Sequence, residues 1–287
     1  MKLGIALSGG GIRGIAHAGV LKALEEENIK IDIIGGTSAG SIIASLYAIG
    51  FSPDEIYDNF SKNSSKIIGN NKIGFFQGIK HIIQQSKVYS GFRNGKSLEE
   101  VVEKLAFSKK IENINEIKMP LVIPTVDIMD SKEYVFTNYI PTEKDNIKRI
   151  NYINNIKIGE AIRASSSFPA VFDICNIDSH SFIDGGALDN IPVGEVKKQG
   201  ADIVIAIKFK GENISKKSNI FDVVMKTIDI MGNRIIEEEL NKSDYILEIN
   251  LESIGMFDIN KIEKCFEIGY ESMKNKLDEL KEILNNF

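Results

Sequence analysis

Residues 36–40 (Gly-Thr-Ser-Ala-Gly) have the spacing of a nucleophile elbow, in which a serine lies between two glycines. The apolar run Ile31–Ile34 before them predicts a buried strand, and the apolar spacing after them predicts a helix. A sharp strand-to-helix turn needs small flanking residues, here Gly36 and Gly40, and it presents the serine hydroxyl at the helix N-terminus. Ser38 is therefore a candidate nucleophile for acyl transfer; the alternative is an ordinary serine cap on a helix.

Residues 9–14 (Gly-Gly-Gly-Ile-Arg-Gly) form a G-x-G-x-x-G loop between a predicted strand, Leu3–Leu7, and a predicted helix. A dinucleotide fingerprint needs an acid at the far end of the second strand, whereas Asp32 stands at its start. The other interpretations are a nest of N–H groups that binds an anion, and a tight turn without a ligand. Because both loops end neighbouring parallel strands at one sheet edge, we expect these N–H groups over Ser38, where an acyl oxyanion would form.

Residues 181–186 (Ser-Phe-Ile-Asp-Gly-Gly) place an aspartate, Asp184, at the end of a short apolar strand. Gly185 and Gly186 after it let another part of the backbone approach closely. A hairpin turn is the alternative interpretation. A carboxylate with a pKa of about 4 is a weak base for a hydroxyl, so Asp184 can act as the general base only when it is partly desolvated and close to the serine.

The three histidines do not follow the order of α/β-hydrolases, which is serine, acid, histidine. None of them comes after Asp184 in the chain. We expect His17 to be a packed polar residue of the first helix, His81 to be solvated, and His180 to be a turn residue. A carboxylate that acts without a histidine is therefore the favoured arrangement.

Together these motifs resemble the patatin-like phospholipase family. The resemblance covers most of the chain: residues 9–14, 36–40, 161–172 (Ala-Ile-Arg-Ala-Ser-Ser-Ser-Phe-Pro-Ala-Val-Phe) and 184–186, with Asn-Ile-Pro at 190–192. It implies a three-layer α/β/α sandwich with a mainly parallel central sheet, similar in fold to cytosolic phospholipase A2. It also implies that lipid acyl esters are hydrolysed by a Ser–Asp dyad through an acyl-enzyme, without a cofactor or metal.

Carried over by motif, the resemblance assigns Ser38 as the nucleophile and Asp184 as the base. Two residues depart from the family pattern: Ser8, where plant members often have Asp, and Asp173, where many relatives have a nearby proline. Neither residue belongs to the dyad. The oxyanion hole that the resemblance implies consists of Gly9, Gly10, Gly11 and Arg13.

The rest of the chain predicts the elements that hold these motifs. Strand, helix, strand and helix alternate near the N-terminus, which favours a parallel sheet covered by helices. Later strands are predicted at Leu121–Asp127, Glu133–Thr137 and Asp202–Phe209, with an antiparallel hairpin between the first two. A long amphipathic helix is predicted at Lys261–Leu284. Because no repeat or linker is visible, we expect residues 1–287 to form one domain.

Residues 52–55 (Ser-Pro-Asp-Glu) have the pattern of a capping box and predict the start of a helix. Residues 61–94 have a different composition, rich in Asn, Lys, Gly and Ser, and are expected to be a surface insertion. Their amphipathic part, Phe75–Gln85, is interpreted either as a packed surface helix or as an apolar lid.

The composition excludes several classes of protein. Hydrophobic residues make up 43% and charged residues 26%, an ordinary globular balance. With a net charge of −5, the protein lacks the positive electrostatic field that is typical of a nucleic-acid binder. The sequence contains no run of 18 apolar residues, so no membrane-spanning helix is predicted. The Leu3–Leu7 run is too short for a signal peptide, and Arg13 interrupts the segment after it.

Two cysteines, Cys175 and Cys265, cannot form a disulfide framework and match no zinc motif, so a reduced, cytoplasmic location is expected. The expected partner is a lipid or phospholipid acyl ester, with peripheral contact to a membrane surface and no nucleic acid. The motifs leave the oligomeric state open. They also leave open a dinucleotide-binding enzyme and a non-catalytic lipid-binding regulatory protein.

Overall fold

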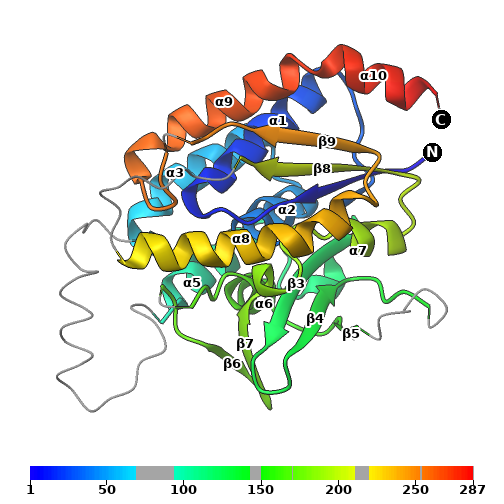
Figure 1. Ribbon diagram of the computed structural model, residues 1–287. Coiled ribbons are helices and arrows are strands. Elements are labelled where there is room, and N and C mark those ends of the chain that lie inside the picture. Colours follow the sequence, from blue (N-terminus) through cyan, green and yellow to red (C-terminus); the bar gives the residue numbers. More distant parts are fainter. Residues whose placement is uncertain (69–93, 143–149, 170, 211–219, 253, 287) are drawn as a thin grey trace.

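The structure, a computed structural model, describes the chain except residues 69–93, 143–149, 170, 211–219, 253 and 287. A mainly parallel sheet lies at its centre, with helices around it (Figure 1). From edge to edge the sheet runs β5-β4-β3-β2-β1-β8-β9, while β7 pairs with β3 and with β6. The strands are β1 (Leu3–Leu7), β2 (Ile33–Gly36), β3 (Leu121–Asp127), β4 (Lys132–Thr137), β5 (Asn151–Ile153), β6 (Cys175–Ile177), β7 (His180–Asp184), β8 (Ile203–Phe209) and β9 (Tyr245–Ile249).

Helices lie between many of the strands along the chain and cover the sheet (Figure 1). The α-helices are α1 (Ile15–Glu26), α2 (Ala39–Ile49), α3 (Pro53–Ile68), α5 (Lys96–Ser108), α6 (Ile158–Ser165), α7 (Val193–Lys198), α8 (Ile220–Leu240), α9 (Ile262–Lys274) and α10 (Leu277–Asn285). Short 3-10 turns are η1 (Gly11–Gly14), η2 (Ile114–Glu116), η3 (Gly185–Ala187) and η4 (Ile259–Lys261).

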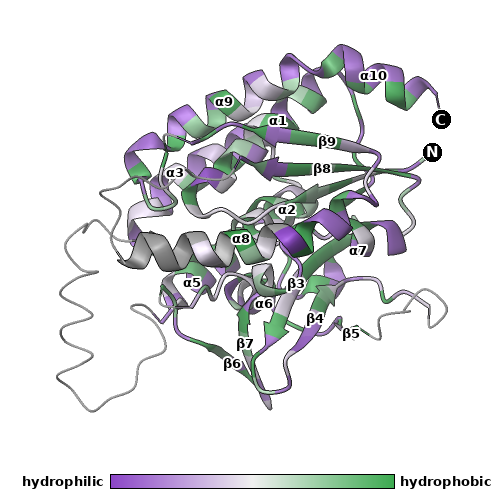
Figure 2. Cartoon of the chain, viewed as in Figure 1, coloured by the Kyte–Doolittle hydropathy of each residue, from purple (hydrophilic) through white to green (hydrophobic). Residues whose placement is uncertain are grey.

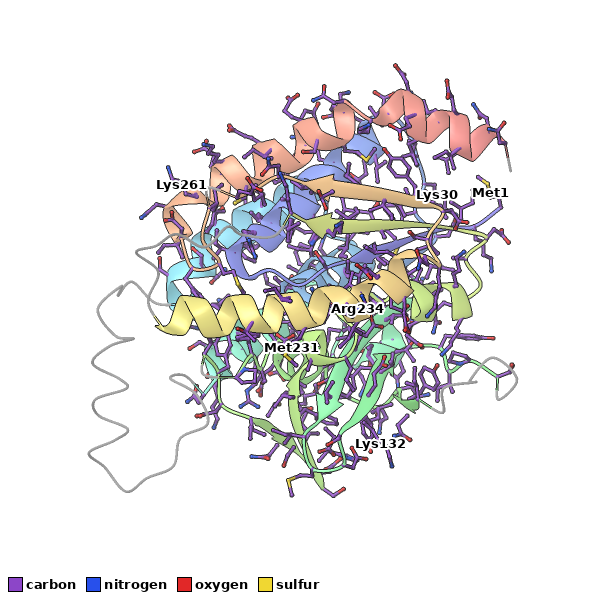
Figure 3. All side chains as sticks on the ribbon, viewed as in Figure 1. Met1, Lys30, Lys132, Met231, Arg234 and Lys261 are labelled. Atoms are coloured by element: carbon purple, nitrogen blue, oxygen red, sulfur yellow. The ribbon has the colours of Figure 1, made fainter. Side chains whose placement is uncertain are left out.

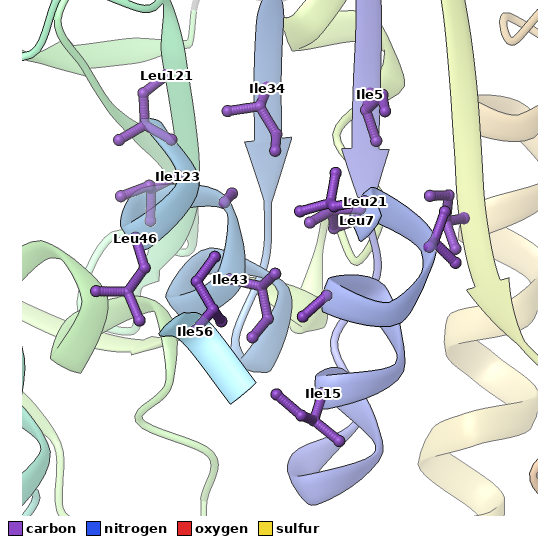
Figure 4. Packing of buried hydrophobic residues seen from close by; sticks show 14 of the residues in the cluster. Ile5, Leu7, Ile15, Leu21, Ile34, Ile43, Leu46, Ile56, Leu121 and Ile123 are labelled. Atoms are coloured by element: carbon purple, nitrogen blue, oxygen red, sulfur yellow. The ribbon is translucent and has the colours of Figure 1, made fainter. Parts of the chain in front are cut away.

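Side chains of the central strands alternate between two apolar layers. Ile5 and Leu7 of β1 join the large core that includes Leu21 of α1 and Ile43 of α2 (Figure 4). Ala6, between them, joins a smaller core with residues of α7 and β8. The strands are mostly apolar along their length, whereas the outer helices α9 and α10 carry polar and apolar residues together (Figure 2). The expected three-layer α/β/α sandwich is therefore confirmed.

Two local predictions are confirmed by hydrogen bonds and pairing. The Ser52 N–H donates to a Glu55 carboxylate oxygen at 2.8 Å, and the Glu55 N–H donates to the Ser52 hydroxyl at 3.2 Å, so the capping box starts α3. Strands β3 and β4 pair antiparallel as the expected hairpin, whose turn includes Ser131 with a φ of 59°.

The predicted helix Lys261–Leu284 is instead two helices, α9 and α10, separated at residues 275–276. A close crossing fixes α9 on α1, because a Cβ at Gly269 would lie only 2.0 Å from the Ala16 carbonyl oxygen. The break lets the second helix take its own direction, and Leu280 in it is fully buried in the same core. A continuous apolar stripe in the sequence does not reveal such a change of direction.

The second strand lies two residues later than predicted and ends at Gly36, so the serine turn follows it directly. Residues 61–68, the first part of the expected surface insertion, continue α3. The predicted amphipathic segment Phe75–Gln85, and with it the lid interpretation, lies outside the described residues. Within the described part of the chain, no helix is long and apolar enough to cross a membrane.

Candidate active site

Strands β2 and β7 lie end to end beside β3. The candidate nucleophile, Ser38, and the candidate base, Asp184, stand where these two strands meet. Gly35 of β2 pairs with Val122 of β3, and Asp184 of β7 pairs with Thr125 further along. Strand β4 pairs with β3 along one side of that strand, so β2 and β7 both pair with its opposite side. Because β2 is parallel to β3 and β7 is antiparallel, their carboxyl ends point toward each other. The ends of β2 and β7 therefore bring Ser38 and Asp184 toward each other from opposite directions.

The serine turn has the backbone that a nucleophile elbow requires. Ser38 has a φ of 53° and a ψ of −121°, an unfavourable region for a residue with a side chain, and it is only partly buried. A Cβ at Gly36 would lie 2.3 Å from the Gly40 carbonyl oxygen, and one at Gly40 would lie 2.5 Å from the Leu7 carbonyl oxygen. Both glycines are therefore required by close backbone contacts, as expected for this turn.

Asp184 is buried, with 4% of its surface exposed. Burial raises its pKa to about 6, and hydrogen bonding from the Ser38 hydroxyl and the Gly186 N–H opposes this rise. Asp184 Oδ1 accepts the Gly186 N–H at 2.8 Å, while Oδ2 has no hydrogen bond of good geometry to any described residue. Oδ2 is thus the carboxylate oxygen left without such a bond, and contacts between a base and its nucleophile commonly tighten when substrate binds.

The position after Asp184 requires glycine, because the backbone at Gly185 lies directly against β3. A Cβ at Gly185 would lie 2.3 Å from the Pro124 carbonyl oxygen and 3.0 Å from Thr37 Cγ2. The Asp-Gly-Gly segment is therefore not a free hairpin turn. This segment packs closely against β3 and Thr37, and so holds Asp184 beside the elbow.

The glycine loop lies over the elbow. A Cβ at Gly9 would lie 3.1 Å from Ser38 Cβ, so the two segments are in contact. The Gly9 N–H is already bound by Asn190, at 3.0 Å to its side-chain oxygen. Among the residues that the structure describes, no acceptor is found for the N–H groups of Gly10 and Gly11. These two donors lie before a helix N-terminus, where the peptide dipoles favour an anion.

Arg13 braces this loop. Its Nε donates to the Gly10 carbonyl oxygen at 3.2 Å, and its guanidinium lies 5.8 Å from the centre of the Phe209 ring. The Ile12 N–H donates to the Met256 carbonyl oxygen at 2.9 Å, which fixes the loop from the other side. Of the four residues expected to form the oxyanion hole, Gly10 and Gly11 present N–H groups, while Gly9 and Arg13 shape the loop.

Two further polar contacts were not predicted. Ser165, at the end of α6, accepts the Ser38 N–H on its hydroxyl oxygen at 3.0 Å. Asn190 connects the glycine loop to the segment after Asp184. Both residues lie in motifs that carried the family resemblance, but nothing in their spacing reveals which backbone group each one binds.

The described histidines have structural partners. His17 is fully buried, donates from Nε2 to the Ser8 carbonyl oxygen at 2.8 Å and stacks on Phe209; burial lowers its pKa to about 4, which keeps it neutral. His180 is not a turn residue: it is the first residue of β7, and its Nδ1 lies 2.6 Å from Asp127 Oδ2. The turn falls just before it, at Asp178 with a φ of 51°.

His81 lies outside the described residues. His180 and Asp184 stand at opposite ends of β7, roughly 13 Å apart at about 3.3 Å per residue. In the described part of the chain, no three His, Cys, Asp or Glu side chains gather as a metal site would require.

An α/β/α sandwich with a serine elbow, a glycine loop and a buried aspartate at the strand ends defines a narrow class of α/β proteins. The chain belongs to the patatin-like phospholipase family, whose sequence pattern it matches over residues 5–197. This match includes the glycine loop, the elbow and the Asp-Gly-Gly segment.

Two relatives illustrate the similarity in sequence. A patatin-like phospholipase domain-containing protein of Caenorhabditis elegans is 26% identical over 312 residues, which cover 96% of this chain and 26% of that protein. Lysophospholipase NTE1 of Yarrowia lipolytica is 28% identical over 205 residues, covering 71% of this chain and 12% of that protein. The chain thus spans about a quarter or less of the length of these relatives.

Solved structures show the same fold at low sequence identity. VipD from Legionella pneumophila has a TM-score of 0.56 at 16% identity, covering 97% of this chain and 67% of that chain. Human GIVD cytosolic phospholipase A2 has a TM-score of 0.54 at 8% identity, covering 99% of this chain and 60% of that chain. The expected likeness to cytosolic phospholipase A2 is confirmed for the fold.

Proposed function

We propose that the protein is a serine lipid acyl hydrolase in which Ser38 attacks the ester and Asp184 is the general base, through an acyl-enzyme. The observation that carries this proposal is the convergence of β2 and β7, which brings a strained, partly exposed serine against a buried carboxyl. Family membership supports the class of reaction. The lysophospholipases among the relatives favour a phospholipid or lysophospholipid ester as the substrate.

The proposed reaction begins when Asp184 takes the hydroxyl proton and Ser38 Oγ bonds to the ester carbonyl carbon. The carbonyl oxygen becomes an oxyanion, which the N–H groups of Gly10 and Gly11 stabilise. The C–O bond to the alcohol then breaks, and Asp184 returns the proton to that oxygen. Water next attacks the acyl-enzyme, Asp184 accepts its proton, and the acid leaves as Ser38 regains a proton.

Burial adapts Asp184 to this role. A base works best when its pKa lies near the working pH, and the rise to about 6 brings Asp184 closer to neutrality than an ordinary aspartate. At pH 7 most of the carboxyl remains ionised and can accept a proton. No histidine is needed for the transfer.

The structure disfavours the alternative of a dinucleotide-binding enzyme. Asp32, the acid such a site would need, accepts the Leu3 N–H at 3.1 Å and pairs with Lys30. Figure 3 shows Lys30 near Met1, at the end of the sheet where the parallel strands begin. The glycine loop lies at the opposite end of these strands, so Asp32 cannot reach a ribose bound there.

Replacing Ser38 by Ala tests the proposal. We expect Ser38→Ala to fold normally and to lose hydrolysis of nitrophenyl esters and lysophospholipids by several orders of magnitude. A fluorophosphonate probe should label Ser38 in the wild type, as located by mass spectrometry. Ser45→Ala is the control, because Ser45 is a buried serine of α2 whose hydroxyl has no described partner.

An active, folded Ser38→Ala variant, or labelling at another serine, would exclude Ser38 as the nucleophile. A wild-type protein that binds lipid vesicles but neither turns over any ester nor reacts with the probe would instead support the non-catalytic alternative. The Ser45→Ala control should match the wild type in both measurements.

A further inference from the structure

Hydrogen bonds from one short segment reach both members of the proposed dyad. The segment is residues 165–167, where α6 ends, and it is called the serine corner below. The Ser165 hydroxyl oxygen accepts the Ser38 N–H at 3.0 Å, and the Ser167 carbonyl oxygen accepts the Asp184 N–H at 3.0 Å. Ser38 and Ser165 are 127 residues apart in sequence. The corner is therefore a shared support for the nucleophile and the base.

The serine corner is itself firmly held. Ser165 and Ser167 are 0% and 1% exposed. The Ser167 hydroxyl donates to the Arg163 carbonyl oxygen at 2.9 Å, and the Arg163 guanidinium donates to the Asn94 carbonyl oxygen at 2.7 and 2.9 Å. The same guanidinium contacts Cys175 Sγ at 2.7 Å. The corner can thus act as a fixed point for the elbow.

The elbow needs such a fixed point because Ser38 has a positive φ. A residue with a side chain leaves this region unless surrounding contacts hold it there. The N–H group of a strained residue turns as its φ changes, so an acceptor on that group opposes relaxation. Ser165 supplies this acceptor from a fully buried position.

We propose that Ser165 is a positioning residue, whose hydroxyl oxygen holds Ser38 in the elbow conformation that directs its Oγ toward Asp184. This inference rests on the proposed function, since Ser38 must be the nucleophile. Ser165 itself does not touch the reacting atoms. Its removal should slow the chemical step and leave substrate binding nearly unchanged.

The neighbouring Ser166 provides a matched control. It is 6% exposed, and its hydroxyl has no hydrogen-bond partner among the described residues. Ser166→Ala therefore removes the same atom from the same corner without affecting the Ser38 N–H. A loss of activity caused by packing alone should appear in both variants, whereas a loss caused by positioning should appear only at Ser165.

The experiment compares Ser165→Ala, Ser165→Thr and Ser166→Ala with the wild type. The measurements are kcat and KM for a nitrophenyl ester, the rate of fluorophosphonate labelling, and thermal unfolding. We expect Ser165→Ala to lower kcat and the labelling rate by about 10- to 100-fold, the range for a misplaced reacting group, with KM changed by about twofold or less. Ser165→Thr retains the oxygen and should recover much of the loss, and Ser166→Ala should match the wild type.

A folded Ser165→Ala variant with wild-type kcat and labelling would overturn the proposal, and so would an equal loss in Ser166→Ala. If Ser165→Ala does not fold, Ser165→Cys replaces it: the weaker sulfur acceptor should give an intermediate loss, and no loss would refute the role. A wild-type protein that is not labelled at Ser38 would refute the proposed function itself, and with it this inference. Failure of the two ideas can therefore be told apart.

Discussion

The Asn190 side-chain oxygen accepts the Gly9 backbone N–H at 3.0 Å, and the Asn190 carbonyl oxygen lies 3.3 Å from the same nitrogen. A Cβ at Gly186 would stand 3.1 Å from that side-chain oxygen, and a Cβ at Gly9 would stand 3.1 Å from Ser38 Cβ. Asn190 therefore lies where the glycine loop, the elbow and the segment after Asp184 meet. Its hydrogen bond to Gly9 fixes the position of the glycine loop relative to Ser38.

Asn190→Ala should remove the side-chain acceptor of the Gly9 N–H, leave only the longer bond to the carbonyl oxygen of residue 190, and let the loop shift relative to Ser38. The oxyanion donors would then be misplaced, and kcat/KM should fall by about 10- to 100-fold. Asn190→Asp keeps the acceptor but adds a carboxylate, which should raise the pKa of Asp184 and move the acid limb of the pH–rate profile upward. Asn176→Ala, at the exposed position of β6, is the control; an unchanged kcat/KM in Asn190→Ala would contradict the assignment.

The residues of the candidate site could be found from the sequence where the backbone restricts residue type. Gly36 and Gly40 contact carbonyl oxygens so closely that only glycine fits, so the elbow is visible in five letters. The alternation of apolar runs with amphipathic helices predicted a parallel sheet covered by helices, and the family resemblance implied the three-layer sandwich. Side-chain alternation in β1, with Ile5 and Ala6 on opposite faces, shows the same principle in space.

The direction of β7 could not be predicted, because a short apolar strand carries no mark of its orientation. Strand β7 pairs with β3 only where β2 has ended at Gly36, and this depends on the whole sheet. The partners of Ser165 and Asn190 were hidden for a similar reason. Each binds a backbone N–H, which every residue except proline has, at sequence separations of 127 and 181.

Gly40→Ala should damage the elbow directly. The new Cβ would lie 2.5 Å from the Leu7 carbonyl oxygen, which is backbone and cannot move aside cheaply. We expect the free energy of unfolding to fall by about 1–3 kcal/mol, as for overpacked sites, and turnover to fall with it. Urea unfolding and kcat measure the two effects.

Gly232→Ala is the matched control for this change. Gly232 lies inside helix α8, and a Cβ there would meet nothing within 4 Å. Since alanine is the better helix former, the free energy of unfolding should rise by about 0.5–1 kcal/mol, with turnover unchanged. If Gly40→Ala behaves like Gly232→Ala, the close contact at the elbow is not a real constraint.

His180→Ala should separate stability from catalysis. Its Nδ1 is bound to the buried Asp127, and its ring stacks on Phe182, so the variant leaves a buried carboxylate with fewer partners. The free energy of unfolding should fall by about 1–3 kcal/mol. At a temperature where the variant is folded, kcat should stay within about twofold of the wild type, since misplacing a group that takes part in the reaction costs far more. A folded His180→Ala protein as inactive as Ser38→Ala would replace the dyad with a triad.

The pKa of Asp184 predicts how activity depends on pH. Only the ionised carboxylate can accept the Ser38 proton, so kcat/KM should rise with pH through about 6 and level off above it. A profile that rises through about 4 would mean that Asp184 is not buried during the reaction. Circular dichroism on the same samples detects unfolding at low pH, which would lower activity for a separate reason.

Asp184→Asn tests the same burial through stability. The folded protein holds the Asp184 proton more tightly than the unfolded chain does, because burial raises the folded-state pKa to about 6. Stability from this group is therefore complete below pH 4 and is lost as the pH rises through 6. A rise in pKa from 3.8 to about 6 corresponds to about 3 kcal/mol, so Asp184→Asn should be more stable than the wild type by up to that amount at pH 8 and by less than about 1 kcal/mol at pH 4. Urea unfolding at both pH values, together with loss of turnover, checks this; an equal difference at the two pH values would show that Asp184 does not carry a buried charge.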